Sequence, residues 1–163
     1  EVQQHLERLT AYDWDESTLR LFIREAQSAG ASDQAMPFMR RLLEDHPDTA
    51  PHVREEVIAL EQAAGNPRAV AALYFQGMQS ATSVAARREA FVAGLRALQA
   101  GDLMAEVPEA ARQYGGPLEN DPDTLVLLVN LMRQANRLDR AEYYVTRLLQ
   151  QRTTATKAGE ARP

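Results

Sequence analysis

The stretch PDTLVLLVNLMRQANRLDRAEYYVTRLL, residues 122–149, contains two apolar patterns of helical spacing on either side of Asn136. The apolar residues recur three or four positions apart, so in each half they share one face of a helix. In the first half they are Leu125, Leu128, Val129 and Met132, and in the second Ala141, Val145 and Leu148. Asn136 stands where a left-handed residue would end the first helix. The stretch therefore predicts two helices joined by a tight turn.

The same turn recurs upstream. Gly30, Gly65 and Gly101 precede Asn136 at spacings of 35, 36 and 35 residues. Each follows one amphipathic stretch and precedes another, and we expect each in the left-handed conformation that ends a helix. A helix pair that recurs about every 35 residues indicates a helical repeat protein.

Prolines support this register. Pro67 and Pro122 each follow a capping residue and fit the first turn of a helix, where the missing N–H costs nothing. Pro37 and Pro108 both lie seven residues after a turn glycine. A proline there removes a backbone hydrogen bond, so it should kink the second helix of its pair or delay its start.

The resulting map contains about nine helices in an all-α chain. The expected segments are the second helix of an incomplete repeat at 1–12, repeats at 16–47, 48–82, 83–118 and 119–152, and a flexible polar tail at 153–163. The expected helices cover approximately 2–11, 16–29, 32–45, 50–64, 67–79, 83–100, 103–114, 122–135 and 138–151.

Composition excludes several classes of function. The net charge is −5, and Lys157 is the only lysine, so the chain lacks the basic surface that nucleic-acid binding needs. Even the longest apolar run has only seven residues, at 69–75, and the run at 125–129 has five, far short of the roughly 20 that a membrane span requires. Neither nucleic acid nor a membrane span is expected.

Catalytic and metal-binding motifs are missing from the sequence. His46 and His52 lie near several carboxylates, but their spacing matches no ligand motif. A Gly-rich phosphate loop and a serine-nucleophile motif are also absent. We therefore expect no enzyme activity, no catalytic residue, no metal and no cofactor.

These positions resemble the tetratricopeptide repeat, a helix pair of about 34 residues. The first pair matches it at Leu19, Phe22, Ile23, Ala26, Ala35, Met39, Leu42 and Pro47. The resemblance covers about residues 16–152, although the Trp and Tyr of the family pattern are missing and Glu106 stands where alanine is usual. It implies a right-handed α-solenoid that binds other proteins.

The arginine-rich repeats ending in NRLDRAEYYVTRLL also resemble the periplasmic scaffold of Pel-type exopolysaccharide export proteins. That resemblance implies a part of a larger bacterial envelope protein, located in the periplasm, with the cytoplasm as the alternative. Its partner would be a periplasmic polysaccharide-modifying enzyme, a deacetylase or hydrolase. Two other functions stay open: direct guidance of a polysaccharide, and a structural spacer between domains.

By analogy with the family, the first helices of the pairs line a partner-binding groove. The expected groove residues are Arg20, Arg24, Arg54, Glu61, Arg88, Phe91, Leu95, Asn130 and Arg133. Arginines suit carboxylate partners, and Phe91 and Leu95 would seat a hydrophobic anchor. In the alternative interpretation the arginines form a solvated helix face, and Phe91 and Leu95 belong to the core.

Overall fold

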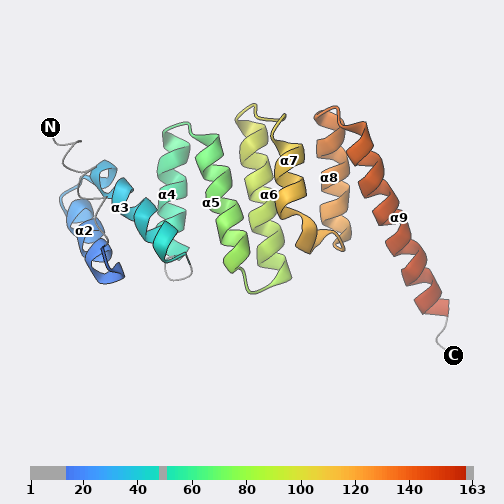
Figure 1. Ribbon diagram of the computed structural model, residues 1–163, viewed down its shortest axis with the longest axis horizontal. Coiled ribbons are helices and arrows are strands. Elements are labelled where there is room, and N and C mark those ends of the chain that lie inside the picture. Colours follow the sequence, from blue (N-terminus) through green and yellow to red (C-terminus); the bar gives the residue numbers. More distant parts are fainter. Residues whose placement is uncertain (1–13, 48–50, 161–163) are drawn as a thin grey trace. The chain divides into compact units, whose positions relative to one another are not determined.

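The computed structural model describes the backbone of residues 14–47 and 51–160, and the side chains of 14–47 and 52–151. These residues form eight α-helices, one short 3-10 helix and no strand, so the all-α prediction is confirmed for them (Figure 1). The elements are α2 (Glu16–Ser28), α3 (Ser32–Asp45), α4 (Pro51–Ala63), α5 (Pro67–Ser80), α6 (Val84–Ala100), α7 (Val107–Tyr114), η1 (Gly116–Leu118), α8 (Pro122–Gln134) and α9 (Leu138–Glu160). The helix expected at 2–11 lies outside the described residues.

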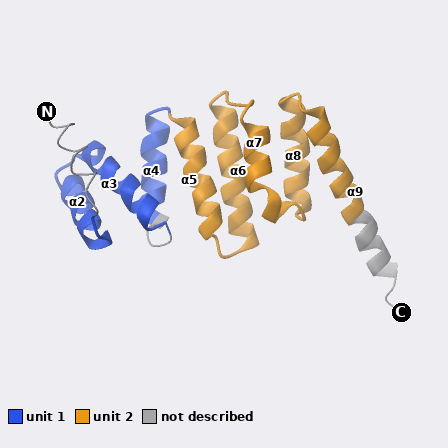
Figure 2. Cartoon of the chain, in the orientation of Figure 1, with its two compact units in different colours: residues 1–65 blue, residues 66–163 orange. Residues whose placement is uncertain are grey.

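The chain divides into two compact units, residues 1–65 and 66–163 (Figure 2). The first contains α2, α3 and α4, and the second contains α5 to α9. The division falls inside the segment 48–82 that the sequence analysis treats as one repeat.

In the first unit, α2 packs along α3, and α3 packs against α4. The Asp15 carboxylate begins α2 by accepting a hydrogen bond of 2.8 Å from the Thr18 backbone N–H. The Phe22 ring lies between the rings of Trp14 and Phe38, with centroid distances of 5.3 and 5.1 Å. Apolar residues at helical spacing bury the remaining faces of these helices, namely Leu19, Ile23, Ala35, Met39, Leu42, Leu43, Val53, Val57 and Ile58.

In the second unit the most extensive helix packing is between α5 and α6. Gly94 of α6 permits this approach, because a Cβ atom there would lie 2.5 Å from Cε1 of Phe75 on α5. One hydrophobic core then runs through the whole unit, with fully buried residues on α6, α7 and α8 and with Ala141 and Tyr144 from α9.

Three of the four predicted left-handed turn residues are confirmed: φ is 70° at Gly30, 72° at Gly65 and 56° at Asn136. The third turn differs. Gly101 has a φ of −88°, and the left-handed residue is Asp102, with a φ of 58°. The prediction for Gly101 was therefore wrong by one position.

Gly101 is required for a different reason. A Cβ atom at this position would lie 2.3 Å from Cγ of Pro67, so the end of α6 touches the start of α5. A glycine thus marks this turn in the sequence without being its left-handed residue.

Three of the turns share a backbone hydrogen bond that closes a helix end. The residue after each left-handed position donates its backbone N–H to a carbonyl five residues earlier. These bonds join Ala31 to Ala26, Leu103 to Leu98 and Arg137 to Met132, at 2.9, 2.9 and 2.8 Å. The repeat seen in the sequence is therefore a repeat of backbone geometry.

Helix α7 begins at Val107 and not at 103 as predicted. Pro108 lies in its first turn, because a proline deeper in the helix would clash with the carbonyl four residues earlier. Pro37 behaves differently and lies inside α3. The delayed start expected for such a proline is thus found at Pro108, whereas α3 continues through Pro37.

Helix α9 continues to Glu160, whereas a flexible tail was expected from 153. Residues 152–160 contain no proline, and alanine, lysine and glutamate among them favour helix. A polar sequence without an apolar stripe was therefore insufficient to predict the end of this helix.

Candidate binding site

In the first unit, the expected groove arginines differ in their surroundings. Arg20 donates to the Glu16 carboxylate at 2.8 Å within α2, and Arg54 donates to the Pro47 carbonyl at 2.6 Å. Arg24 is exposed. The structure therefore places two of the three in local contacts and one in solvent.

Glu61 faces the interior of the first unit. Only 1% of its surface is exposed, and the Arg40 guanidinium on α3 donates to its carboxylate with an Nε–Oε1 distance of 2.9 Å. A carboxylate buried in this way needs a charged partner, because desolvation of an unpaired charge is costly. Glu61 thus ties α4 to α3 and offers no accessible surface to another molecule, contrary to the groove hypothesis.

Phe91 and Leu95, the expected apolar centre of the groove, are fully buried in the core of the second unit. The ring of Phe91 lies 6.3 Å from that of Phe75, which belongs to α5. Their side of α6 faces neighbouring helices, so these residues hold the unit together. Here the structure agrees with the alternative interpretation, in which they are core residues.

The polar groove residues of the second unit lie on α6 and α8. Nη1 of Arg88 is 3.2 Å from a carboxylate oxygen of Asp121 and 3.2 Å from one of Asp123. Asn130 and Arg133 are exposed on α8. These residues are therefore solvated, and Val126 of α8, which lies four residues before Asn130, is 47% exposed beside them.

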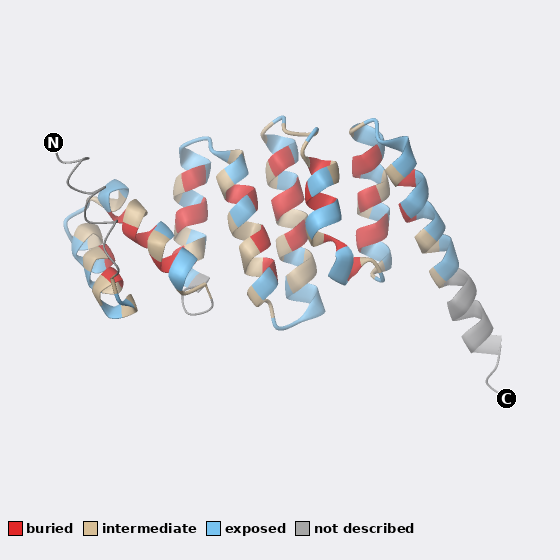
Figure 3. Cartoon of the chain, viewed as in Figure 1, coloured by how far each residue is buried: buried red, intermediate tan, exposed pale blue. Residues whose placement is uncertain are grey.

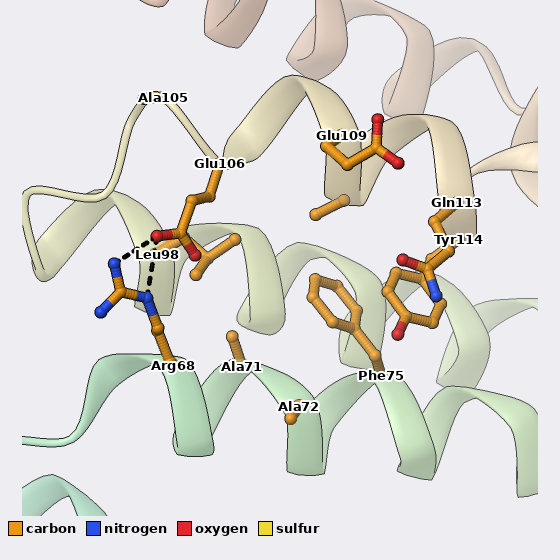
Figure 4. A pocket seen from close by; sticks show the side chains of 11 residues that line it. Arg68, Ala71, Ala72, Phe75, Leu98, Ala105, Glu106, Glu109, Gln113 and Tyr114 are labelled. Atoms are coloured by element: carbon orange, nitrogen blue, oxygen red, sulfur yellow. Dashed lines mark hydrogen bonds and ion pairs between the residues drawn. The ribbon is translucent and has the colours of Figure 1, made fainter.

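The second unit does contain a concave apolar site, on other residues. It is a pocket of about 370 Å³ between α5 and α7, with Leu98 of α6 at its floor (Figure 4). We call it the α5–α7 pocket. Its lining residues are Arg68, Ala71, Ala72, Phe75, Leu98, Ala105, Glu106, Glu109, Ala110, Gln113 and Tyr114.

Small and aromatic side chains shape the α5–α7 pocket. Four alanines line it, and three of them lie on α5 and α7, so methyl groups cover the helix backbones there. At one end the rings of Phe75 and Tyr114 stack, with centroids 4.3 Å apart and planes inclined by 12°. The result is an apolar hollow with one flat aromatic wall, which suits an apolar or aromatic group.

Charged residues line the mouth of the pocket. Arg68 donates to Glu106 with an Nε–Oε1 distance of 2.8 Å, as Figure 4 shows, and this hydrogen bond raises the pKa of Arg68. Arg112 donates to Glu109 with an Nε–Oε2 distance of 3.0 Å, and this hydrogen bond lowers the pKa of Glu109. Both glutamates thus accept hydrogen bonds from arginines, and the lining itself holds one arginine and two glutamates.

No protein-family model, curated protein or solved structure matches this chain. The α5–α7 pocket is the concave apolar feature of this chain that bears on its function.

Within the described ranges, no group of three or more His, Asp or Glu side chains is placed to hold a metal ion. In the same part of the chain, none of the helices combines the length and apolar character needed to cross a membrane.

The α5–α7 pocket was not predicted from the sequence, because a binding groove was expected on the first helix of each pair. Most of the lining comes from the second helices, α5 and α7. Two signals were present: the adjacent alanines Ala71 and Ala72, and Pro108, which delays α7 and leaves Ala105 outside it. Neither signal distinguishes a pocket from close helix packing without the tertiary structure.

Proposed function

We propose that this chain is a non-enzymatic helical-repeat scaffold that binds another protein, and that the α5–α7 pocket receives an apolar side chain of that partner. The observation that carries this proposal is the pocket itself. Its volume of about 370 Å³ accommodates a large side chain, and its wall is apolar and aromatic. Partner proteins commonly concentrate binding energy in one or two such buried anchors.

The mouth of the pocket favours a particular partner sequence. Glu106 and Glu109 lie on the α7 side, whereas Arg68 is the only arginine in the lining. A partner segment with an aromatic or aliphatic anchor and a neighbouring basic residue would complement this arrangement. Because both glutamates have arginine partners, the charges contribute selectivity more than affinity.

The proposed architecture is a right-handed α-solenoid of the tetratricopeptide type. The recurring helix-closing turns at Gly30, Asp102 and Asn136 support it, since each joins two antiparallel helices with the same backbone hydrogen bonds. Small-angle X-ray scattering from the whole chain tests this part, because a solenoid gives an extended profile and a globular bundle does not.

The proposed partner class is a periplasmic polysaccharide-modifying enzyme in an exopolysaccharide secretion apparatus. This part rests on the sequence resemblance of the arginine-rich repeats to Pel-type export scaffolds. Under this proposal the chain holds the enzyme in place and takes no part in its chemistry.

The first experiment places a photo-crosslinking amino acid, p-benzoylphenylalanine, at position 113, where the native Gln113 is exposed and lines the pocket. The captured protein is identified by mass spectrometry, purified and titrated against the chain by calorimetry. We expect Ala72→Trp, which fills the pocket, to weaken binding at least about tenfold. Ala100→Trp is the matched control, because Ala100 is exposed on α6 outside the lining.

Equal binding by the native chain and Ala72→Trp would show that the pocket is not the binding site. A captured protein with no polysaccharide-modifying activity would contradict the proposed partner class while leaving the scaffold function in place. Retardation of the chain in a polysaccharide gel, with no captured protein, would instead favour direct polysaccharide guidance.

A further inference from the structure

A side-chain contact joins the two walls of the α5–α7 pocket at each of its ends. At one end Arg68 donates from Nε and Nη2 to Oε1 of Glu106, at 2.8 and 2.5 Å, and at the other end Phe75 stacks on Tyr114. Leu98 of α6, which forms the floor, is buried. Figure 3 shows buried and exposed residues alternating along α5 and α7, the helices that form the walls. The pocket thus has a buried floor and a mouth lined by polar side chains.

The two glutamates of the lining are not equally available to an occupant of the pocket. Arg112 donates to both side-chain oxygens of Glu109, from Nε to Oε2 at 3.0 Å and from Nη2 to Oε1. In Figure 4 the carboxyl group of Glu109 points away from Leu98 and Phe75. Glu109 therefore borders the mouth but offers its oxygens to Arg112 and not to the hollow.

Glu106 keeps one side-chain oxygen open. Both hydrogen bonds from Arg68 end on Oε1, and no donor within the described part of the chain is hydrogen-bonded to Oε2. In Figure 4 this second oxygen lies beside Leu98, with which Glu106 shares the lining of the pocket. The side chain of Glu106 is 41% exposed, so solvent reaches it. Glu106 thus presents an open acceptor at one end of the pocket.

This open acceptor restricts which side chains suit the pocket. An occupant that fills the hollow displaces solvent from Oε2 of Glu106, and an acceptor that loses water without gaining a donor costs free energy. A leucine or phenylalanine anchor is therefore disfavoured, although it matches the apolar walls. The preferred occupant has a donor at the end that contains Glu106 and Leu98, and an apolar body that reaches toward Ala71 and Phe75.

Among large side chains, the indole of tryptophan meets both requirements. It combines a flat apolar body, which suits the aromatic wall, with one N–H donor and no acceptor that the pocket would have to satisfy. Tyrosine adds an oxygen whose lone pairs the alanines of the wall cannot pair. Lysine and arginine bring a charge that the apolar walls would separate from water at a cost. The donor, the size and the flat shape therefore all favour tryptophan.

We infer that the α5–α7 pocket selects a tryptophan of the partner protein, whose indole N–H donates to Oε2 of Glu106 while Arg68 stays bound to Oε1. This inference rests on the proposed function and narrows it, because the anchor is now an indole and not any apolar side chain. Glu106 is then the residue that determines the specificity of the pocket.

Two small ring compounds test this hydrogen bond without the partner. Indole has the N–H donor, and 1-methylindole carries a methyl group in its place. Each is titrated into the isotopically labelled chain, and the amide chemical shifts of the pocket lining are followed by NMR. We expect indole to bind with saturation and at least about fivefold more tightly than 1-methylindole, because only indole can donate to Glu106. Ala72→Trp, which fills the pocket, should abolish these shifts.

Glu106→Ala is the deciding variant, and Glu109→Ala is the matched control, with the same substitution at the other glutamate of the lining. Glu106→Ala should bind the two compounds about equally, with the affinity for 1-methylindole unchanged, whereas Glu109→Ala should keep the native preference. If Glu106→Ala weakens both compounds equally, its contact with Arg68 only maintains the shape of the pocket and the inference is wrong. Equal binding of the two compounds to the native chain, or no saturable shift with indole, would also overturn it.

The partner captured by the cross-linker at position 113 provides a second test. We expect its cross-linked segment to contain a tryptophan whose replacement by phenylalanine weakens binding to the native chain at least about tenfold, and to Glu106→Ala much less. A partner that fills the pocket with leucine or phenylalanine would overturn this inference and leave the proposed function in place. A chain that prefers indole through Glu106 but captures no protein would support the indole site and contradict the proposed function, so the two failures are distinguishable.

Discussion

Gly94 and Gly30 illustrate two different structural reasons why a position requires glycine. At Gly94, ring atoms of Phe75 lie 2.5–2.9 Å from the place of a Cβ atom, so any side chain would push two helices apart. At Gly30 a Cβ atom would meet nothing within 4 Å, but the φ of 70° is unfavourable for a residue with a side chain. A glycine in the sequence predicts one of these constraints and does not say which.

Gly94→Ala should lower the free energy of unfolding by about 1–2 kcal/mol, because the cost of overpacking exceeds the gain in helix propensity. The Phe75 ring cannot move away freely, since it stacks on Tyr114 and lies against Phe91. Urea denaturation of the whole chain measures this change. Gly116→Ala, where a Cβ atom meets nothing within 4 Å, is the control and should change stability by less than about 0.5 kcal/mol. An unchanged Gly94→Ala variant would show that α5 and α6 are less closely packed.

Asp121 caps α8 by accepting hydrogen bonds from the backbone N–H and the hydroxyl of Thr124, at 2.9 and 2.5 Å. Partial desolvation raises the pKa of Asp121, but the Thr124 hydrogen bonds and the charge of Arg88 together outweigh it, so this pKa lies below its ordinary value of 3.8. The carboxylate form is therefore favoured in the folded state. Its contribution to stability is complete above the unfolded pKa and is lost as the pH falls through the lower, folded pKa.

Asp121→Ala should cost about 1 kcal/mol at neutral pH, the usual value of a helix cap. The difference from the native chain should shrink as the pH falls below 3.8, where the native cap becomes protonated. Urea midpoints measured across this pH range test both statements. Asp123→Ala removes the same charge and the other Arg88 contact without removing a cap, and should cost less. A loss for Asp121→Ala that does not depend on pH would contradict the role of the carboxylate.

At the scale of helices and turns, periodicity predicted most boundaries to within one or two residues, as for α3 and α8. Two boundaries were not predictable in this way. The start of α7 depends on how Pro108 is accommodated, and the continuation of α9 to Glu160 needs no apolar stripe. Apolar periodicity identifies the face that a helix buries. It therefore does not predict the end of a helix whose last turns bury no apolar face, or the start of a helix that is set by a proline.

The α6–α7 turn offers a test of turn geometry. Asp102 has a φ of 58°, and glycine adopts this conformation without the steric cost that a side chain adds. We expect Asp102→Gly to stabilise the chain by about 0.5–1 kcal/mol and Asp102→Ala to destabilise it by about 1 kcal/mol, as thermal unfolding followed by circular dichroism would show. If both substitutions had the same sign, strain at this residue would not be the deciding factor.

At the scale of the whole chain, the two units differ in how complete a hydrophobic core each contains. The core cluster that contains Phe91, Leu95 and Leu128 draws all its members from residues 71–148, inside the second unit. In the first unit, most of the packing is between α2 and α3. Helix α4 packs less extensively against α3, through apolar residues and the Arg40–Glu61 hydrogen bond. The second unit therefore contains a continuous core of its own.

Residues 66–163 expressed alone should fold cooperatively, with a urea m value of about 1–2 kcal/mol per molar, as is usual for a domain of this size. Circular dichroism and urea titration provide the measurement. A broad, non-cooperative transition would show that the core of the second unit is insufficient without residues 1–65.

The candidate site was less predictable than the fold. Arg88, Asn130 and Arg133 were correctly assigned to the first helices of their pairs, but Phe91 and Leu95 were assigned to a surface when they lie in the core. An apolar residue on an amphipathic helix belongs to the core or to an exposed anchor, and sequence spacing is the same in both cases. Only the positions of neighbouring helices decide between them.

The late start of α7 has a consequence for how this protein changes over evolution. Residues 101–106 reach one end of the α5–α7 pocket from a turn and not from a regular helix. Insertions and deletions are tolerated in turns far better than in packed helices. Related chains are therefore free to widen, narrow or recharge the pocket by altering this short segment, with no matching substitutions among the core residues. Under the proposed function, the binding specificity of the pocket would then change without loss of stability.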